Sequence, residues 1–466
     1  MTPLPGAIVL LAIPLAAALV AYVLRRWPPA AALVSVSASA SLAVLCGRLP
    51  LDRSAFVLGQ EVAFGRPVVV AGRTLMLDAA GQFWLAFVFV LAAAAFVLAW
   101  RLKQGRLFFP FGLVLLSFYV LIALLQTFSL ALLAFAMSAT PALFLIQGDK
   151  PGPVQGSERY LLVTLLAAPM LLAAAWLAGQ GQLAAENAEI ARMGLVPAAL
   201  GFGLLLAAFP FGTWMPALIS GAPPLVGAFL ITAGQAMALF LALLFLRDVP
   251  WIVQDAALLE VVQFVGLVTV VAGALMAAVQ RDLGRLFGYA ALSDVGYLWL
   301  ALGTGGSQAL TLSVLHTANR AAPILLMGAC LALLRSRAGS DAFACLRGAA
   351  RRLPIHTAGF LIGGLALAGF PMTAGFATHW GVGRAIAGAH WTWTALLLAS
   401  SGGIVIGLLR ALSAMLGDEP RDDMGKQPVV RSILIVVVAT LVLALGVYPQ
   451  LFLPPIRRAV EALALF

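Results

Sequence analysis

Uncharged apolar runs of roughly 18 residues or more recur along this 466-residue chain, and each run is long enough to cross a bilayer as an α-helix. The chain is 63% hydrophobic and only 10% charged, whereas a water-soluble domain typically carries about a quarter charged residues. No stretch keeps the alternation of a barrel strand for long, which excludes an outer-membrane barrel. The sequence therefore predicts an all-α polytopic membrane protein.

The apolar runs predict about fourteen transmembrane helices joined by short loops. The predicted ranges are 5–24, 29–47, 80–100, 108–126, 127–147, 159–179, 195–212, 222–246, 257–279, 286–303, 308–334, 356–384, 391–413 and 430–450. The longest polar stretch, residues 48–79, contains the segment RPVVVAGRTLML. Its alternation predicts a small β-hairpin on the membrane surface.

The net charge of +10 does not indicate nucleic-acid binding, because Lys and Arg lie between the apolar runs and form no basic face. Loops that follow odd-numbered helices hold 18 of these residues, against 9 in the other loops. Since the positive side of a membrane protein is the cytoplasmic side, both termini are predicted to face outward. We expect a multi-pass protein of the bacterial cell (inner) membrane.

The sequence offers few ligands for a metal or a redox group. Its three cysteines, Cys46, Cys330 and Cys345, have spacings that suit neither a metal site nor a disulfide framework, and the chain has only four histidines. We therefore predict no metal site, no iron–sulfur cluster, no haem and no other cofactor of its own.

Two of the predicted helices contain helix-breaking residues. Pro210 and Gly212 lie at the end of the seventh helix, and Pro371 and Gly375 lie midway through the twelfth. Proline removes a backbone donor and clashes with the preceding turn, so both segments are predicted to break and expose carbonyl groups. Each could be a kink that only shapes packing. Two breaks five helices apart instead favour a transporter built from inverted repeats.

Ionisable residues are distributed unequally between the two halves of the chain. Predicted helices 4, 5, 7 and 8 contain no Asp, Glu, Lys, Arg or His, and their polar candidates include Ser138, Thr213 and Gln235. Hydroxyl and amide groups can hold water but cannot store a proton at physiological pH. The second half carries a set of ionisable side chains within predicted helices 10 to 12, namely Asp294, His316, Arg320 and His379.

An ionisable side chain inside a membrane is a functional hypothesis by default. Arg320 is too deep to reach either surface and needs a counter-charge, for which Asp294 on the preceding helix is the obvious candidate. His316 lies four residues before Arg320, on the same helix face. Two interpretations remain open. Asp294 and Arg320 form a fixed neutral pair beside structural histidines, or His316 and His379 pass protons in the field of that pair.

Several segments are similar to a known family. They are AAFPFGTWMPALISGAPPLVGAFL (207–230), RDLGRLFGYAALSDVGYLWLALG (281–303), LHTANRAAPILLMGACLALL (315–334) and LRGAARRLPIHTAGFLIGGLALAGFPMTAGFATHWGV (346–382). The chain resembles, over roughly residues 75–415, the antiporter-like N, M and L membrane subunits of respiratory complex I. Mrp-type cation/proton antiporters and membrane-bound hydrogenases share this family.

The resemblance implies two inverted five-helix repeats with interrupted helices 7 and 12. The implied organisation is an N-terminal part with helices 1–3 and an outward hairpin loop (1–106), a first repeat of helices 4–8 (107–250), a second repeat of helices 9–13 (251–415), and helix 14 with a C-terminal tail (416–466). The implied partners are other membrane and peripheral subunits of a multisubunit complex, the lipid bilayer and protons.

The family's proton-handling residues transfer unevenly onto this chain. In the first half, the family's glutamate falls on Ala136 and one of its lysines falls on Leu205. A second lysine falls on Gln235 or Met237, and a histidine falls on Gly212. In the second half, the helix-10 histidine falls on Asp294, a histidine is kept as His316, and two lysines become Arg320 and His379. Arginine does not give up its proton in a protein, so Arg320 can set a field but cannot relay.

Three functions remain open at this stage. The first is a proton-translocating, or degenerate proton-channel, subunit of a complex-I-like or hydrogenase-like redox-driven assembly. The second is a scaffold subunit that transports nothing, which the charge-free first half favours. The third is the proton-conducting partner of a two-component inorganic-carbon uptake system.

Overall fold

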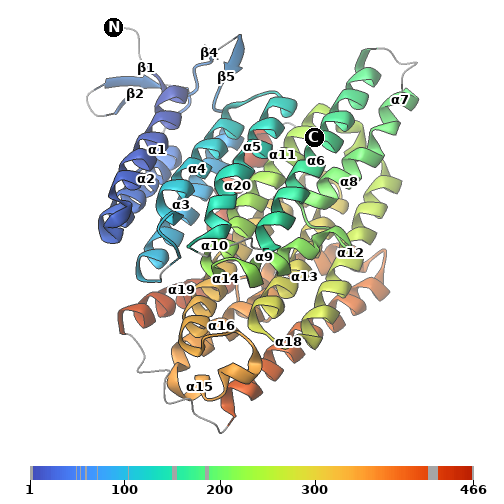
Figure 1. Ribbon diagram of the computed structural model, residues 1–466. Coiled ribbons are helices and arrows are strands. Elements are labelled where there is room, and N and C mark those ends of the chain that lie inside the picture. Colours follow the sequence, from blue (N-terminus) through green and yellow to red (C-terminus); the bar gives the residue numbers. More distant parts are fainter. Residues whose placement is uncertain are drawn as a thin grey trace.

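Apolar helices account for most of the computed structural model, in which they pack as a single bundle (Figure 1). The structure describes the chain except for residues 1–3, 49, 53, 58–59, 71, 103, 150–154, 184–187, 418–428 and 464–466. Outside the described residues lie parts of loop 48–79 and five of the Lys and Arg residues counted in the loops, at positions 53, 103, 150, 421 and 426.

The first part of the bundle contains helices that match the predicted ranges to within a few residues. They are α1 (Gly6–Val23), α2 (Pro28–Arg48), α3 (Ala79–Arg101), α4 (Phe108–Leu124), α5 (Phe128–Gln147), α6 (Gln155–Leu183), the short α7 (Ala188–Met193), α8 (Leu195–Leu205), α9 (Trp214–Gly221), α10 (Pro224–Phe229) and α11 (Gln235–Asp248).

The second part follows the same pattern. Its helices are α12 (Ala256–Val279), α13 (Leu283–Gly303), α14 (Gly306–Ala338), the short α15 (Ala349–Arg352), α16 (Pro354–Leu367), α17 (Phe376–Ala387), α18 (Trp391–Leu416), α19 (Val429–Val447) and α20 (Leu453–Ala462).

Among the described residues, 11 helical segments are long and apolar enough to cross a membrane. Two further apolar helices, α4 and α16, are shorter than that limit. Every predicted range coincides with one helix or with a pair of shorter helices. The chain is thus a multi-pass membrane protein, while the number of fourteen crossings stays a prediction.

Both segments predicted to break are interrupted in the structure. The seventh predicted helix ends at Leu205 instead of residue 212, because the chain turns before Pro210 and resumes as α9. The twelfth divides into α16 and α17. The two helix ends before the breaks share one backbone pattern, in which Ala208 N–H bonds to Gly203 and Phe370 N–H bonds to Leu365. This six-residue closure is typical of a helix end with a left-handed residue.

The eighth predicted helix, expected to be continuous, is also irregular. A five-residue π-helical segment, η4 (Leu230–Gly234), separates α10 from α11. Neither proline nor a charge marks this segment in the sequence, so the interruption was not predicted. π-helical turns occur mostly as single insertions in α-helices and often at functional sites.

Among the described residues, five short strands lie in two small sheets at the upper end of the molecule in Figure 1. The predicted hairpin is confirmed as antiparallel strands β4 (Val68–Val70) and β5 (Arg73–Leu75). The sequence interpretation missed the other sheet, which has strand order β1 (Leu4–Pro5), β3 (Gln60–Ala63), β2 (Ser54–Val57).

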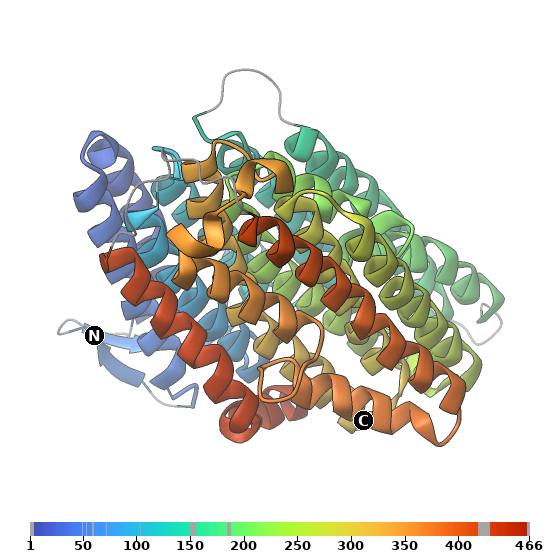
Figure 2. The same cartoon turned by 90° about the horizontal axis from the view of Figure 1, so that it is seen from below.

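The centre of the bundle is formed by α10–α11, α13 and α14. The most apolar 18-residue stretch of α14 is entirely buried within the protein. In each of α1, α18 and α19, only 28% of the corresponding stretch is buried. In Figure 2 these outer helices lie along the periphery. Of the four ionisable residues predicted for the second half, Asp294 is on α13, His316 and Arg320 are on α14, and His379 is on α17.

Candidate functional site

Asp294 and Arg320 form a buried ion pair at the centre of the bundle. The Asp294 Oδ2 atom lies 2.6 Å from Arg320 Nε, and the two side chains are only 1% and 3% exposed. A buried charge is stable only when it is paired and its remaining polar atoms are bonded. The structure therefore contains the counter-charge that Arg320 requires.

The other guanidinium nitrogens of Arg320 are bonded as well. Nη1 donates to Gln235 Oε1 over 2.6 Å, and Nη2 donates to the Ala291 carbonyl over 3.2 Å. Gln235 begins α11, directly after the π-helical segment, so the predicted first-half residue belongs to the second-half cluster. Arg320 thereby joins the two halves of the chain through its own side chain.

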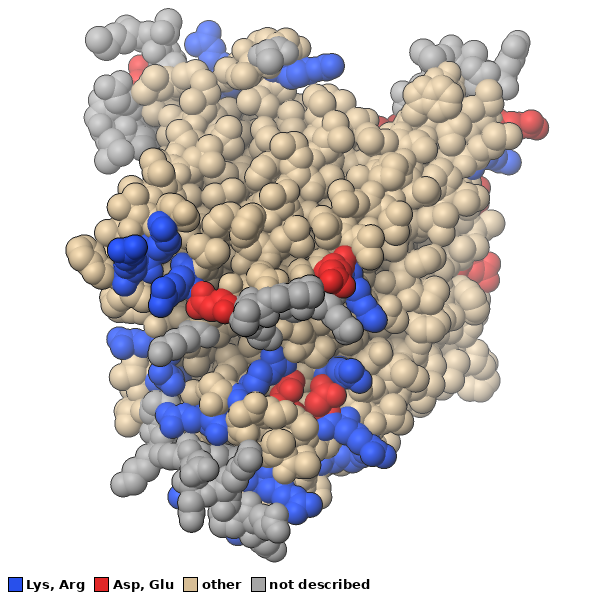
Figure 3. Space-filling view, viewed as in Figure 1, with Lys and Arg blue, Asp and Glu red and all other residues tan. Residues whose placement is uncertain are grey.

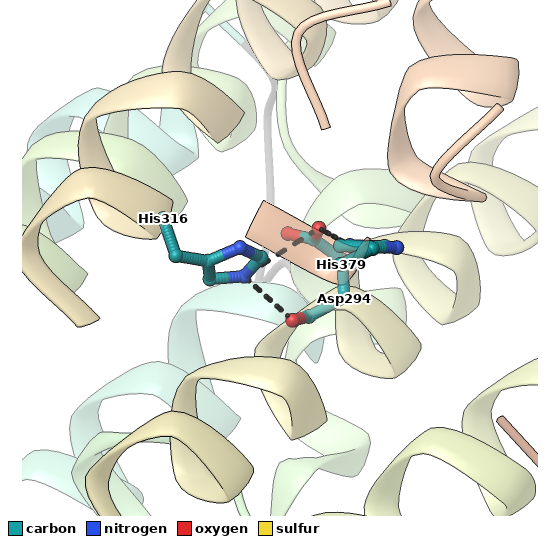
Figure 4. A group of neighbouring side chains, drawn as sticks. All are labelled: Asp294, His316 and His379. Atoms are coloured by element: carbon teal, nitrogen blue, oxygen red, sulfur yellow. Dashed lines mark hydrogen bonds and ion pairs between the residues drawn. The ribbon is translucent and has the colours of Figure 1, made fainter. Parts of the chain in front are cut away.

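His316 faces the backbone and the carboxylate of Asp294 with the same nitrogen. Its Nε2 lies 2.9 Å from the Asp294 carbonyl oxygen and 3.6 Å from Asp294 Oδ1 (Figure 4). Both neighbours are acceptors, so Nε2 carries a hydrogen. The protonation state of His316 is consequently decided at its other nitrogen, Nδ1.

Nδ1 of His316 contacts the hydroxyl of Thr378, at 3.0 Å from Oγ1. The same hydroxyl lies 3.0 Å from the Gly375 carbonyl, to which it can donate. A hydroxyl has one hydrogen to donate. When Thr378 donates to Gly375, it can accept from a doubly protonated His316. When it turns its hydrogen to Nδ1, His316 is neutral. This threonine therefore accommodates both protonation states.

His379 approaches Asp294 from the interrupted helix. Its Nε2 lies 3.1 Å from Asp294 Oδ1, so one carboxylate oxygen faces both imidazoles (Figure 4). The Tyr297 ring stacks on His379 with ring centroids 3.7 Å apart and planes 8° from parallel. His379 Nδ1 is buried and has no hydrogen-bond partner among the described residues.

A cavity of about 240 Å³ borders His379 and lies between α17 and α18. This volume is enough for several water molecules. Besides His379 and Tyr297, its polar lining includes Arg384, Thr394 and Ser401. Arg384 is exposed near the end of α17, so the cavity leads from the buried cluster along α17 to the protein surface.

Asp294, His316 and His379 are also a possible set of metal ligands, since one donor atom from each lies within 4.8 Å of the others. Two imidazoles and a carboxylate suit zinc. Arg320, however, already neutralises the carboxylate at 2.6 Å. A divalent ion there would leave two uncompensated positive charges in a buried site, which is strongly unfavourable. The cluster fits protons better than a metal.

The other predicted polar residues of the first half do not join this cluster. Ser138 is buried on α5 and donates to the Phe135 carbonyl over 2.6 Å. Thr213 is exposed, in the turn that precedes α9. Leu205 is buried at the end of α8 and faces a narrow pocket that it shares with Tyr160, Thr164 and Gln235.

The seventh-helix break is stabilised by side chains that the sequence interpretation did not assign. Trp214 Nε1 donates to the Leu204 carbonyl, and Trp299 Nε1 donates to the Leu206 carbonyl, each over 3.1 Å. The Phe209 N–H donates to Thr269 Oγ1 over 3.0 Å. Backbone groups freed by a break inside a membrane need such partners. Pro210, by contrast, is exposed at the turn, as is Pro371 in the other break.

The sequence interpretation also missed three residues of the cluster itself: Gln235 as a partner of Arg320, Thr378 and Tyr297. Tyr297 lies three residues after Asp294 and thus on one helix face with it, and Thr378 directly precedes His379. These spacings were available signals, although neither residue is charged.

Interrupted helices around a buried ionisable cluster, in a bundle of membrane-spanning helices, define a class of protein that includes transporters. The family model described as "NADH:quinone oxidoreductase/Mrp antiporter, TM" matches residues 126–407. Because this match covers more than half of the sequence, the chain belongs to that family.

Curated relatives in this family are named NADH-quinone oxidoreductase subunit N. The protein from Ectopseudomonas mendocina is 31% identical over 291 residues, which are 59% of this chain and 58% of the relative. The protein from Cereibacter sphaeroides is also 31% identical, over 69% of this chain and 72% of the relative. With the first of these, the match thus spans little more than half of the relative's length.

Solved structures show the same fold at low sequence identity. A chain of the Mrp complex from Dietzia sp. DQ12-45-1b has a TM-score of 0.83 at 17% identity, covering 98% of this chain and 97% of its own length. A chain of respiratory complex I from Thermus thermophilus has a TM-score of 0.80 at 18% identity, covering 98% and 99%.

Proposed function

We propose that this chain is a proton-translocating membrane subunit of a complex-I-like or hydrogenase-like redox-driven assembly, with no redox cofactor of its own. The observation that carries the proposal is the Asp294 cluster, in which one carboxylate oxygen faces two imidazoles beside a cavity. Imidazole is the side chain best suited to take up and release protons near neutral pH.

The proposed path begins in the cavity beside α17. A proton from cavity water reaches Nδ1 of His379, the buried nitrogen that has no partner among the described residues. His379 then releases its Nε2 proton toward Asp294 Oδ1, which lies 3.1 Å away. His316 Nε2, 3.6 Å from the same oxygen, takes this proton when the imidazole is in the tautomer that carries its hydrogen on Nδ1 and donates it to Thr378 Oγ1, while Thr378 donates to the Gly375 carbonyl.

Arg320 takes no part in the transfer, because a guanidinium keeps its proton. Its charge instead favours the ionised form of Asp294, to which the carboxylate returns after each transfer, and fixes the carboxylate between the two histidines. The path that we propose therefore uses the second half of the chain only. The inward-facing residues of the first half are hydroxyls, amides and apolar side chains, such as Ser138, Gln235 and Leu205.

The charge distribution supports an orientation with both termini outward, in a bacterial inner membrane. On the face seen in Figure 3, most Lys and Arg side chains lie over the lower part, away from the strands. This end is the cytoplasmic side under the positive-inside rule. The cavity beside α17 then opens toward the outer side, since α17 runs from the mid-bundle break to the loop at Ala387.

The two helix breaks, with their shared backbone pattern, support a first repeat in residues 107–250 and a second in 251–415. Redox partners are proposed from the relatives, which are named as subunits of NADH-quinone oxidoreductase. Purification from the native membrane in mild detergent, followed by mass spectrometry, tests this assembly. Co-purified iron–sulfur and quinone-site subunits are expected. A soluble zinc protein as the sole partner would contradict a redox-driven complex.

A scaffold that conducts nothing is the second candidate, favoured by the close mutual neutralisation of Asp294 and Arg320. Proton flux into proteoliposomes that contain the full chain distinguishes the two functions. His316→Gln keeps a polar side chain but cannot be protonated. We expect this variant to lose most of the potential-driven flux, whereas Ser138→Ala, in the first half, keeps it. Flux no greater than that of lipid-only vesicles in all three proteins would support the scaffold.

A further inference from the structure

A narrow cleft between α3, α16 and α19 is lined by a basic cluster that the proton path does not use. Its described lining consists of Arg101, His356 and Arg431 together with four leucine and isoleucine side chains. Arg337 adds another positive charge within electrostatic range of the His356 ring. The charged and polar residues of this lining are therefore all basic or imidazole groups.

His356 is fully buried at the base of the cleft. Both of its ring nitrogens lack a hydrogen-bond partner among the described residues. Leaving a buried polar atom without a partner is unfavourable, so such atoms are uncommon in folded proteins. Both nitrogens are therefore available to bond to a group from outside the chain.

Two helix N-termini add to the positive field of the cleft. His356 is the third residue of α16, and Arg431 is the third residue of α19. The first turn of a helix carries N–H groups without intrahelical partners and the positive end of the helix dipole, and both favour an anion. These two helices pack against each other, so their first turns lie together at the cleft.

The position of the cleft relative to the membrane surface indicates where an anion bound there would come from. Arg101 lies over the ring of Trp100, with its guanidinium carbon 4.7 Å from the ring centroid. Trp100 is 41% exposed at the end of a membrane-spanning helix, which is the usual place of an interfacial anchor. The cleft therefore lies at the level of the lipid headgroups, and at the end of the bundle where the basic loops gather.

We propose that this cleft binds the phosphate of an anionic phospholipid headgroup. Arg101 and Arg431 contact the phosphate oxygens at the mouth of the cleft, where the side chains part enough for His356 to donate one hydrogen bond from below. Because the cleft is narrow, the phosphate stays at its mouth and the acyl chains lie along the apolar side chains of α3 and α19. Basic pockets between membrane helices on the cytoplasmic side are known to hold anionic headgroups.

Native mass spectrometry of the full chain tests this site. The purified protein is incubated in mild detergent with equal amounts of phosphatidylglycerol and phosphatidylcholine. We expect retention of phosphatidylglycerol in preference, and a roughly fivefold lower occupancy in Arg101→Gln and in Arg431→Gln. Arg281→Gln removes an exposed arginine elsewhere on the same predicted side and serves as the matched control.

Further measurements separate the possible outcomes. Since Arg431 is only half-buried, Arg431→Gln is expected to remain folded, which size-exclusion chromatography verifies. Loss of bound phosphatidylglycerol on addition of inorganic phosphate would assign the site to free phosphate and overturn the lipid assignment. No preference between the two lipids, or an equal loss in Arg281→Gln, would refute an anion site in this cleft.

Discussion

Replacing Asp294 by Asn isolates the role of its charge, because asparagine has nearly the same shape. In the variant, Arg320 keeps its bonds to Gln235 and to the Ala291 carbonyl but loses the carboxylate at 2.6 Å. Removing one partner of a buried ion pair typically costs about 3–5 kcal/mol, because the other charge stays buried without compensation. We expect a loss of this size in the free energy of unfolding.

The loss can be measured by unfolding the full chain in mild detergent with increasing mole fractions of dodecyl sulfate, followed by tryptophan fluorescence. Asp248→Asn is the matched control, since Asp248 is 48% exposed and lies 3.6 Å from Arg247. Exposed pairs contribute only about 0–1 kcal/mol. The double variant with Arg320→Gln should recover much of the stability lost in Asp294→Asn. If Asp294→Asn costs no more than the control, or if the two changes simply add, the reasoning about the pair is wrong.

Three further changes test other parts of the structure. Thr378→Val removes the hydroxyl that accommodates both states of His316, so proton flux should fall at least tenfold in proteoliposomes while the protein stays folded; unchanged flux would exclude this hydroxyl. Leu205→Lys should restore no flux to the first half, because the position of its expected partner is Ala136; any gain would contradict that account. Arg335→Gln removes an ion pair with Asp341 and bonds to the end of α9, and should cost about 1–3 kcal/mol in the same unfolding titration; no loss would show that this contact is dispensable.

The sequence predicted the parts of the site that follow from the cost of burying charge. An arginine in the middle of an apolar helix needs an anion, and Asp294 was the suitable one on the preceding helix. The breaks at Pro210 and Pro371 were likewise predictable, because each proline costs a backbone bond and has a glycine within four residues, whereas Pro141 and Pro323 lie inside continuous helices. Both inferences depend on local chemistry that a single sequence contains.

Neutral contacts between distant segments could not be predicted in this way. Gln235 is 85 residues from Arg320, and an amide can satisfy its hydrogen bonds with many partners. Trp299 reaches the Leu206 carbonyl only because α13 packs against α9, on the far side of the break. The π-helical segment before Gln235 contains two weak helix formers, Thr232 and Gly234, but these residues alone do not predict a π-helical turn within an apolar run.

Proton flux through His379→Gln tests the central claim most directly. This residue connects the cavity beside α17 to Asp294, and glutamine can keep the hydrogen bond to the carboxylate without accepting a proton. The measurement is the rate of internal acidification of proteoliposomes under an imposed potassium-diffusion potential, with lipid-only vesicles as background. We predict that flux falls to the background in His379→Gln and remains in Ser138→Ala. Flux equal to that of the unmodified chain would contradict a proton path through the second half.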